Sequence, residues 1–274
     1  MTIYRASVVD TPADPFAGAA LRSDGDVGLA VADGGIVDRG SFAAVRERRP
    51  DDEVVDLRAG LLLPGLVDTH VHYPQLRVIG ALGLPLLDWL ERCALPEEAR
   101  LADVDYARDV AREFTAALVD AGTTTALVFG SHFPGAVDAL FQAASSSGLR
   151  VTSGLVVGDR LLRAELHTSA AQAYEDGRAL ADRWHGSGRC RYAVIPRFSL
   201  SCSDDLLDSC AALHADVAGS WFTSHINENP AEIAKVRELF GGSYLDSYDK
   251  HGLVGPRSVF AHNVHSTEDE LELL

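Results

Sequence analysis

Two different hydrophobic patterns divide the chain near residue 60. Residues 1–60 carry short runs in which apolar and polar positions alternate, and the pair Gly34–Gly35 separates two of these runs. Alternation of this kind is typical of half-buried β-strands, and glycines between two such runs indicate a hairpin. We therefore expect residues 1–60 to form a small β subdomain, one part of a composite β-sandwich.

From residue 61 onward, apolar runs of strand length alternate with helical patterns. The stretch from Asp103 to Gly122, for example, begins at an acidic N-cap candidate and ends at a glycine, as helices commonly do. The expected strands are LLLPGLVDTHVH, TTTALVFG, VTSGLVVGD, YAVIPRFSL, SWFTSHINE and SVFAHNVH. Near-continuous apolar strands that alternate with helices predict an α/β fold with a parallel sheet covered on both faces.

The C-terminal ends of these strands share polar or ionisable side chains. These are His70 and His72, Arg197, His225 with Glu228, and His262. Functional groups at several strand ends are typical of a TIM barrel, whose active site lies at that face. No G-x-G-x-x-G motif follows the first of these strands, so a dinucleotide-binding fold loses its main support. We predict a TIM-type (β/α) barrel over residues 61–274.

The predicted barrel is incomplete. Only about six strands of the βα type follow residue 61, whereas a closed barrel has eight. The final residues STEDELELL have the pattern of a helix start, with Ser266 or Thr267 as the N-cap and Asp269 or Glu270 at the capping-box position. We therefore expect the chain to be truncated before the last strands of its architecture.

Composition and charge favour a small-molecule ligand. The 274 residues are 47% hydrophobic and include 40 acidic and 24 basic side chains, a net charge of −16, which disfavours nucleic acid and anionic membranes as partners. No apolar run approaches the roughly 20 residues of a membrane span. The N-terminus lacks the pattern of a secretory signal, so the expected location is the cytoplasm. The four cysteines form no C-x-x-C pair and are expected to be reduced.

The two histidines of DTHVH form a candidate metal site. Because side chains alternate along a strand, His70 and His72 point to the same side and can share one ion. The pair equally fits an ordinary strand end followed by a loop residue. A third imidazole, His225, at the end of a later strand favours the metal site. Glu228, just before a helix start at Asn229–Pro230, is placed to move a proton between a water and a leaving group.

Other histidines and the lysines limit this site to one ion. His262 ends another strand in phase with Phe260, so we expect it at the barrel mouth as a ligand or a hydrogen-bonding group. Among the remaining histidines, only His132, after the second strand, is a further candidate for the site. The only lysines, Lys235 and Lys250, lie outside the strands, so none is available to bridge two metals. The H-x-E and P-C-x-x-C signature of the zinc cytidine deaminases is absent.

These strand ends carry a resemblance to a known family. PGLVDTHVH, TSHINEN and FAHN resemble the amidohydrolase superfamily, metal-dependent hydrolases on a TIM barrel with a small flanking β-sandwich. Within it, LPLLDWLE, PRFSLSCS, HINENPAEI and YDKHGL are similar to the guanine deaminase family, from about Leu61 to Leu274. The resemblance implies hydrolysis of a C–N bond in a cyclic amidine, converting guanine to xanthine and ammonia with a metal-activated water.

The resemblance also implies a role for each matching residue. His70 and His72 match the first-strand metal ligands, and His225 matches the fifth-strand ligand, which also borders the substrate. Glu228 matches the glutamate that shuttles protons. His262 matches the sixth-strand histidine that positions the water.

For a guanine substrate, the resemblance implies that Gln75, Arg197 and Phe198 line the base pocket. Arg197 suits this role because its planar fork of donors can meet a carbonyl and a ring nitrogen together, and Phe198 offers a stacking face. The family's last metal ligand, an aspartate at the end of the eighth strand, has no counterpart in this chain. Three histidines hold zinc in known sites, and imidazole suits iron as well.

Two alternatives stay open at this point. A related aminohydrolase acting on another purine or on a triazine ring would share the metal residues, and Arg197 with Gln75 is what favours guanine. The second alternative is a truncated fragment that is inactive by itself. The leucine-rich segment 73–102 is interpreted either as a cover over the pocket or as a subunit contact, the latter consistent with a homodimer.

Overall fold

The computed structural model describes residues 1–274 and divides the chain into two compact units, Met1–Gly65 and Leu66–Leu274. The expected boundary after residue 60 falls inside β4 (Glu53–Leu62), which belongs to the first unit. The run LLLPGLVDTHVH, predicted as one strand, is therefore two: β4 ends at Leu62, and β5 (Leu66–His72) begins after Pro64 and Gly65. Proline has no backbone N–H to continue a β ladder, which accounts for the interruption.

The first unit is a four-stranded sheet with one short helix. Its elements are β1 (Thr2–Asp10), β2 (Arg22–Ala32), β3 (Gly35–Ser41), α1 (Phe42–Arg48) and β4, in the sheet order β3-β2-β1-β4. The predicted hairpin joins β2 to β3, but its turn is formed by Asp33 and Gly34, with φ of 49° and 76°, and Gly35 already belongs to β3. Two consecutive residues with positive φ match the twist of a tight hairpin. The small β unit is thus present as a single sheet.

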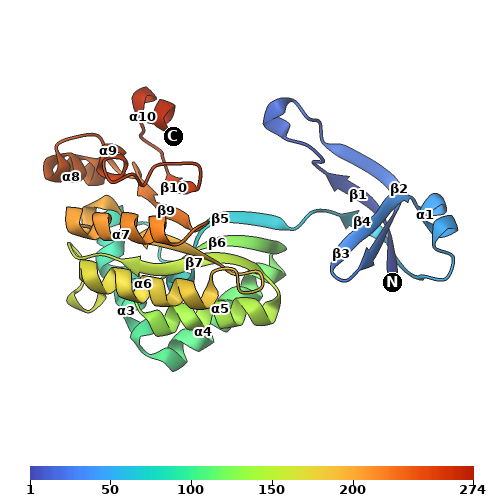
Figure 1. Cartoon of the computed structure of the whole chain (residues 1–274), viewed down its shortest axis with the longest axis horizontal. Helices are drawn as coiled ribbons and strands as arrows, with labels where there is room; N and C mark the ends of the chain where they lie inside the picture. The colour runs from blue at the N-terminus through green and yellow to red at the C-terminus, as the bar shows by residue number, and fades with distance from the viewer. The chain divides into compact units, whose positions relative to one another are not determined.

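The second unit contains six parallel strands that lie in sequence order, β10-β9-β8-β7-β6-β5 (Figure 1). The strands are β5, β6 (Thr123–Ser131), β7 (Arg150–Val157), β8 (Arg191–Pro196), β9 (Trp221–Ile226) and β10 (Ser258–His262). The helices are α2 (Leu86–Trp89), α3 (Leu95–Ala99), α4 (Val104–Asp120), α5 (Pro134–Ser147), α6 (Ala170–Trp184), α7 (Asp204–Asp216), α8 (Pro230–Phe240), α9 (Asp246–Asp249) and α10 (Glu268–Leu273). The predicted α/β barrel architecture with six strands is confirmed.

Side chains on the two faces of these strands form separate apolar clusters. The main core includes Val128 and Val194, which pack with the helices. The small inner cluster includes Phe129, Ala193 and Ile195 on the opposite face of the same strands. Because alternate side chains of a strand point to opposite faces, β6 and β8 each supply both clusters. The inner cluster therefore forms a packed floor inside the partial barrel.

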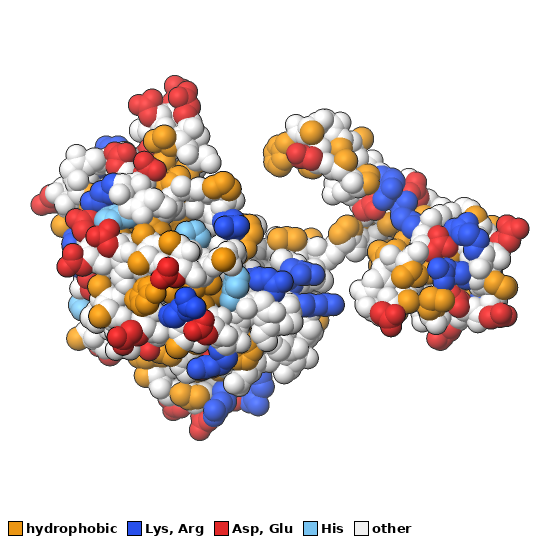
Figure 2. Space-filling view, in the orientation of Figure 1, with side chains coloured by type: hydrophobic (Ala, Val, Ile, Leu, Met, Phe, Trp, Pro, Cys, Tyr) orange, Lys and Arg blue, Asp and Glu red, His pale blue; other side chains and the backbone are white.

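Local interactions set where the helices begin. The Asp103 side chain accepts backbone hydrogen bonds at the start of α4, and Asn229 does the same at the start of α8. Thr267 and Glu270 form a capping box at α10, one of the two expected pairings. The acidic first turn of α10, at the top of Figure 2, also complements the positive end of the helix dipole.

All four cysteines are free thiols, as expected. None of the helices combines the length and the apolar character that crossing a membrane requires.

Two glycines allow neighbouring strands to approach closely. A Cβ atom at Gly130 in β6 would lie 2.0 Å from the carbonyl oxygen of Gly154 in β7, and a Cβ atom at Gly154 would lie 1.9 Å from the carbonyl oxygen of Ala193 in β8. Both contacts are with backbone atoms, which cannot rotate away. The spacing of these three strands therefore depends on glycine at both positions.

We expect Gly154→Ala to lower the free energy of unfolding by about 3 kcal/mol or more, because the added methyl group forces the strands apart. Gly255→Ala is the matched control, since a Cβ there meets nothing within 4 Å, and it should change the free energy by less than about 0.5 kcal/mol. Urea denaturation followed by circular dichroism measures both variants. Equal midpoints for Gly154→Ala and the unaltered chain would contradict this account of the strand spacing.

Candidate active site

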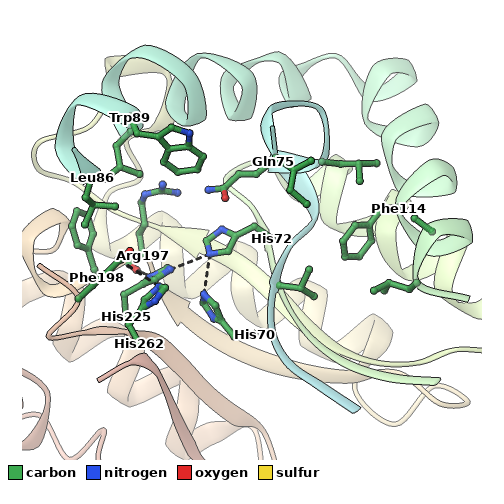
Figure 3. Close-up of a pocket in the computed structure, with 17 residues that line it drawn as sticks. His70, His72, Gln75, Leu86, Trp89, Phe114, Arg197, Phe198, His225 and His262 are labelled. Atoms are coloured by element: carbon green, nitrogen blue, oxygen red, sulfur yellow. Dashed lines mark hydrogen bonds and ion pairs between the residues drawn. The ribbon is translucent and has the colours of Figure 1, made fainter. Parts of the chain in front are cut away.

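A cavity of about 470 Å³ lies at the C-terminal ends of β5, β8, β9 and β10 (Figure 3). Its lining includes every residue that the sequence singled out for the site: His70, His72, Gln75, Arg197, Phe198, His225, Glu228 and His262. These residues come from positions as far apart as 70 and 262, and the parallel order of the strands brings them to one edge of the sheet.

Three imidazoles converge on one point of this cavity. His72 Nε2 lies 3.2 Å from His70 Nε2 and 3.0 Å from His225 Nε2 (Figure 3). His225 Nδ1 lies 2.6 Å from the backbone carbonyl oxygen of Arg197, which can only accept a hydrogen bond. Nδ1 of His225 therefore carries the proton, and the lone pair of its Nε2 is directed at the other two rings. This donor set fits a metal ion.

Burial keeps these imidazoles neutral. Desolvation, with a smaller contribution from His262, lowers the pKa of His70 to about 4. Desolvation and the neighbouring histidines place the pKa values of His72 and His225 well below the usual range. A histidine must be unprotonated to bind a metal ion. His70, His72 and His225 thus form a group that could hold one.

Phe129 supports all three rings, although nothing in the sequence distinguished it from other apolar strand residues. Its ring stacks on His72 with centroids 4.5 Å apart and an interplanar angle of 24°. It also lies 4.4 Å from the His225 ring and 5.3 Å from the His70 ring. Because Phe129 belongs to the buried inner cluster, it holds the imidazole planes against a rigid apolar floor.

Glu228 and His262 lie next to the histidine group. His262 Nε2 is 3.5 Å from Glu228 Oε2, and the His262 ring stacks on His225 with centroids 5.3 Å apart. Burial raises the pKa of the Glu228 carboxyl, and the charge of Arg197 opposes that rise in part. A carboxyl with a raised pKa exchanges protons more readily near neutral pH.

The backbone beside these two residues is strained. His262, Asn227 and Asn263 have φ angles of 74°, 50° and 52°, in a region that residues with a side chain rarely adopt. Hydrogen bonds join the two loops. The Asn227 side chain donates to Ser266 Oγ at 2.8 Å, and the backbone N–H of Asn263 donates to the carbonyl oxygen of Ile226, the last residue of β9, at 2.9 Å. Strain of this kind is often found at functional sites.

Glu98 is the second group that the sequence analysis missed. Its buried carboxylate accepts hydrogen bonds from Gln75 Nε2 at 2.8 Å and from Arg197 Nη1 at 2.5 Å, and His132 Nε2 lies 3.5 Å away. Burial acts to raise the pKa of Glu98, but the charge of Arg197 and the His132 and Gln75 donors outweigh it and hold the pKa at about 2. The charged pair Glu97–Glu98 inside a leucine-rich segment was the available signal.

The segment 73–102 lines the cavity, which corresponds to the first of its two interpretations. Leu76, Leu86, Trp89 and Leu90 from this segment form an apolar wall. In Figure 3 the Trp89 indole lies on the same side of the cavity as the Arg197 guanidinium. An apolar and aromatic wall with a few polar groups is typical of sites that bind planar small molecules.

Residues 61–274 match the sequence model of the amidohydrolase family. The chain belongs to this family. Among its amidohydrolase relatives is a protein named probable guanine deaminase from Deinococcus radiodurans, 59% identical over 282 residues, covering 100% of this chain and 64% of the relative. The structure also superposes on Escherichia coli guanine deaminase with a TM-score of 0.95 and 38% identity, covering 98% of this chain and 64% of that one.

A third relative is the guanine deaminase of C. acetobutylicum, whose structure is described with guanine bound in the active site. It matches with a TM-score of 0.91 and 27% identity, over 99% of this chain and 64% of that chain. The amidohydrolase chain described here thus spans less than two thirds of the length of these relatives.

A buried carboxyl, that of Glu232, lies in the first turn of α8, shortly after Glu228 in the sequence. Glu232 is fully buried, accepts a hydrogen bond from the Tyr244 hydroxyl, and has no partner for Oε2. Burial raises its pKa to about 7, against the opposing effect of the Tyr244 hydrogen bond. Because its pKa in the folded state lies above the usual value of 4.5, the folded chain binds more protons than the unfolded chain between these two pH values.

Stability should therefore fall as the pH rises from about 4.5 to about 7, and Glu232→Gln should remove this part of the loss. We expect the free energy of unfolding of Glu232→Gln, relative to the unaltered chain, to increase by on the order of 2 kcal/mol between pH 5 and pH 7.5. Denaturant titrations at both pH values measure it. Glu238→Gln, on the exposed side of α8, is the control, and an equal pH response of the two variants would contradict the prediction.

Proposed function

We propose that this protein is a purine aminohydrolase of the guanine deaminase type, which hydrolyses guanine to xanthine and ammonia. The observation that carries the proposal is one cavity that combines three convergent neutral imidazoles with the Glu228 carboxyl and the Arg197–Gln75 pair. The identity of 59% to a protein named probable guanine deaminase supports the choice of substrate.

His70, His72 and His225 would hold one metal ion through their Nε2 atoms. Zinc is the proposed ion because three imidazoles are a known ligand set of catalytic zinc, and iron accepts the same donors. When bound, such an ion lowers the pKa of a water molecule to near 7 and so makes hydroxide accessible at neutral pH.

Glu228 is the proposed proton carrier. Its carboxylate would take a proton from the attacking water, deliver it to the ring nitrogen beside the attacked carbon, and then assist the departure of ammonia. His262, 3.5 Å from the Glu228 carboxylate, would orient the water through Nε2. Glu228 and His262 would keep their positions relative to His225 because the His262 ring stacks on the His225 ring.

Arg197, Gln75 and Phe198 are the proposed contacts for the base. The guanidinium of Arg197 would donate hydrogen bonds to the carbonyl oxygen and a ring nitrogen of guanine. Phe198 and Trp89 would present apolar faces to the planar ring. The homodimer and the cytoplasmic location predicted from the sequence stay predictions, and the exposed side chains of Ile79 and Leu82 belong to the segment expected at the dimer contact.

The decisive assay is turnover of a panel of purines, pterins and triazines, followed by ammonia release and the ultraviolet spectrum. We expect guanine to be the preferred substrate, and Glu228→Gln to lower kcat by about 10²- to 10⁴-fold, the usual contribution of a general acid–base group. Because the chain spans less than two thirds of its relatives' length, the assay is run on residues 1–274 and on any longer product that its gene encodes. Turnover of another ring without turnover of guanine would overturn the proposal.

Metal binding is tested separately from turnover, by metal analysis and by competition with a chelator. We expect one zinc ion per chain, and His72→Ala should weaken its binding by at least about 100-fold, because ligand loss exceeds the effect of losing an outer partner. His167→Ala removes an exposed histidine outside the cavity and serves as the control. Undiminished zinc binding by His72→Ala would exclude the three-histidine site.

A further inference from the structure

The base-binding wall, formed by the proposed base contacts Gln75, Arg197 and Phe198, carries two polar groups that share one buried anion. Gln75 and Arg197 both donate hydrogen bonds to Glu98, one to each carboxylate oxygen. The Glu98 side chain is about 2% exposed, and Arg197 is about 4% exposed. Neither Glu98 nor its third polar neighbour, His132, lines the cavity, so Glu98 acts on a bound molecule through Gln75 and Arg197.

The carboxylate determines which end of the Gln75 amide faces the cavity. An ionised carboxylate only accepts hydrogen bonds, so the amide must turn its Nε2 donor toward Glu98. The Oε1 acceptor is then the end of Gln75 that is left for a ligand. Without the anion, the amide could present either its donor or its acceptor.

The same carboxylate orients Arg197 and neutralises its charge. One Nη1 hydrogen bond is used by Glu98, and the remaining donors of the planar guanidinium stay available. An unpaired guanidinium at this depth would be strongly unfavourable, whereas the pair leaves the wall without net charge. A neutral ring with a carbonyl acceptor suits such a wall.

We infer that Glu98 is a positioning residue that makes Gln75 present an acceptor and Arg197 present donors to the substrate ring. The inference rests on the proposed function and deepens it. A lactam edge, in which a ring N–H stands beside a carbonyl oxygen, complements this pattern, and guanine carries one. A purine that has an unprotonated ring nitrogen and no carbonyl at that edge, such as 2-aminopurine, does not complement it.

The variant Glu98→Gln tests this directly because it keeps the size of the side chain. The new amide can still accept from Arg197 through its oxygen, but it then turns its NH₂ group toward Gln75. Gln75 must rotate to accept that bond, and it presents a donor to the cavity in place of an acceptor. Glu98→Gln should therefore change the preference between ligands, and not only the overall affinity.

Binding is measured in the Glu228→Gln background, so that no ligand is consumed, by the fluorescence of 2-aminopurine and its displacement by guanine. Zinc is present in all samples. We expect the starting protein to prefer guanine. Glu98→Gln should weaken guanine binding by about 10- to 100-fold, the usual effect of an unsatisfied buried polar group. The affinity for 2-aminopurine should change by less than about threefold, because that ligand makes no use of the Gln75 acceptor.

Two further variants make the result specific. Glu97→Gln alters the neighbouring buried carboxylate, which binds Arg100 away from the cavity, and should leave the preference unchanged. Glu98→Asp keeps the charge and should retain a preference for guanine at lower affinity. If Glu98→Gln does not fold by circular dichroism, the preference of Glu98→Asp decides, and its loss overturns the inference.

The outcomes separate the inference from the function on which it rests. An equal loss of both ligands in Glu98→Gln would mean that Glu98 only holds the structure together, and it would overturn the inference alone. Failure of the starting protein to prefer guanine would overturn the proposed function and the inference with it. The inference and the proposed function are both supported if Glu98→Gln selectively loses affinity for guanine and Glu97→Gln does not.

Discussion

Arg197 joins the two halves of the site, and the rest of the cavity depends on that junction. Its backbone carbonyl accepts the Nδ1 proton of His225 and so directs the His225 Nε2 lone pair into the histidine group. Its side chain donates to Glu98 and lines the cavity together with Gln75. Arg197, which directly follows β8, thereby fixes the tautomer of His225 through its main chain and pairs with the buried Glu98 through its side chain.

The junction is effective because the strands beneath it are closely packed. The inner cluster around Phe129 fills the floor of the partial barrel. Gly130 in β6 and Gly154 in β7 let the neighbouring backbones come closer than a side chain with a Cβ atom would allow. A floor of this density leaves little room for the imidazole planes to rotate. Convergence of the three Nε2 atoms is therefore a consequence of packing as well as of residue type.

The rim of the site that Glu228 and His262 form is built differently. Glu228 lies in the loop after β9, and His262 is the last residue of β10, where the next loop begins. The backbone of these two loops is strained at Asn227, His262 and Asn263. Each such conformation costs on the order of 1–3 kcal/mol and persists because hydrogen bonds between the two loops overdetermine it. The rigid histidine group and the strained rim thus place a candidate metal site beside a candidate proton carrier.

Local sequence patterns were enough to predict the features that depend on near neighbours. The period of the apolar residues predicted the six strands and their helices, the spacing of His70 and His72 predicted a shared face, and the caps at Asp103 and Asn229 located helix starts. The recurrence of ionisable groups at strand ends identified the cavity, because parallel strands place those ends together.

Features that join distant parts of the chain could be seen only in the folded protein. Glu98 meets Arg197 across 99 positions, and Phe129 meets three histidines from β5 and β9, through contacts that no local pattern encodes. Local patterns reflect interactions over a few residues, whereas these contacts exist only after the six strands have aligned. The pairing of Glu98 with Gln75 and Arg197 is one result of that alignment.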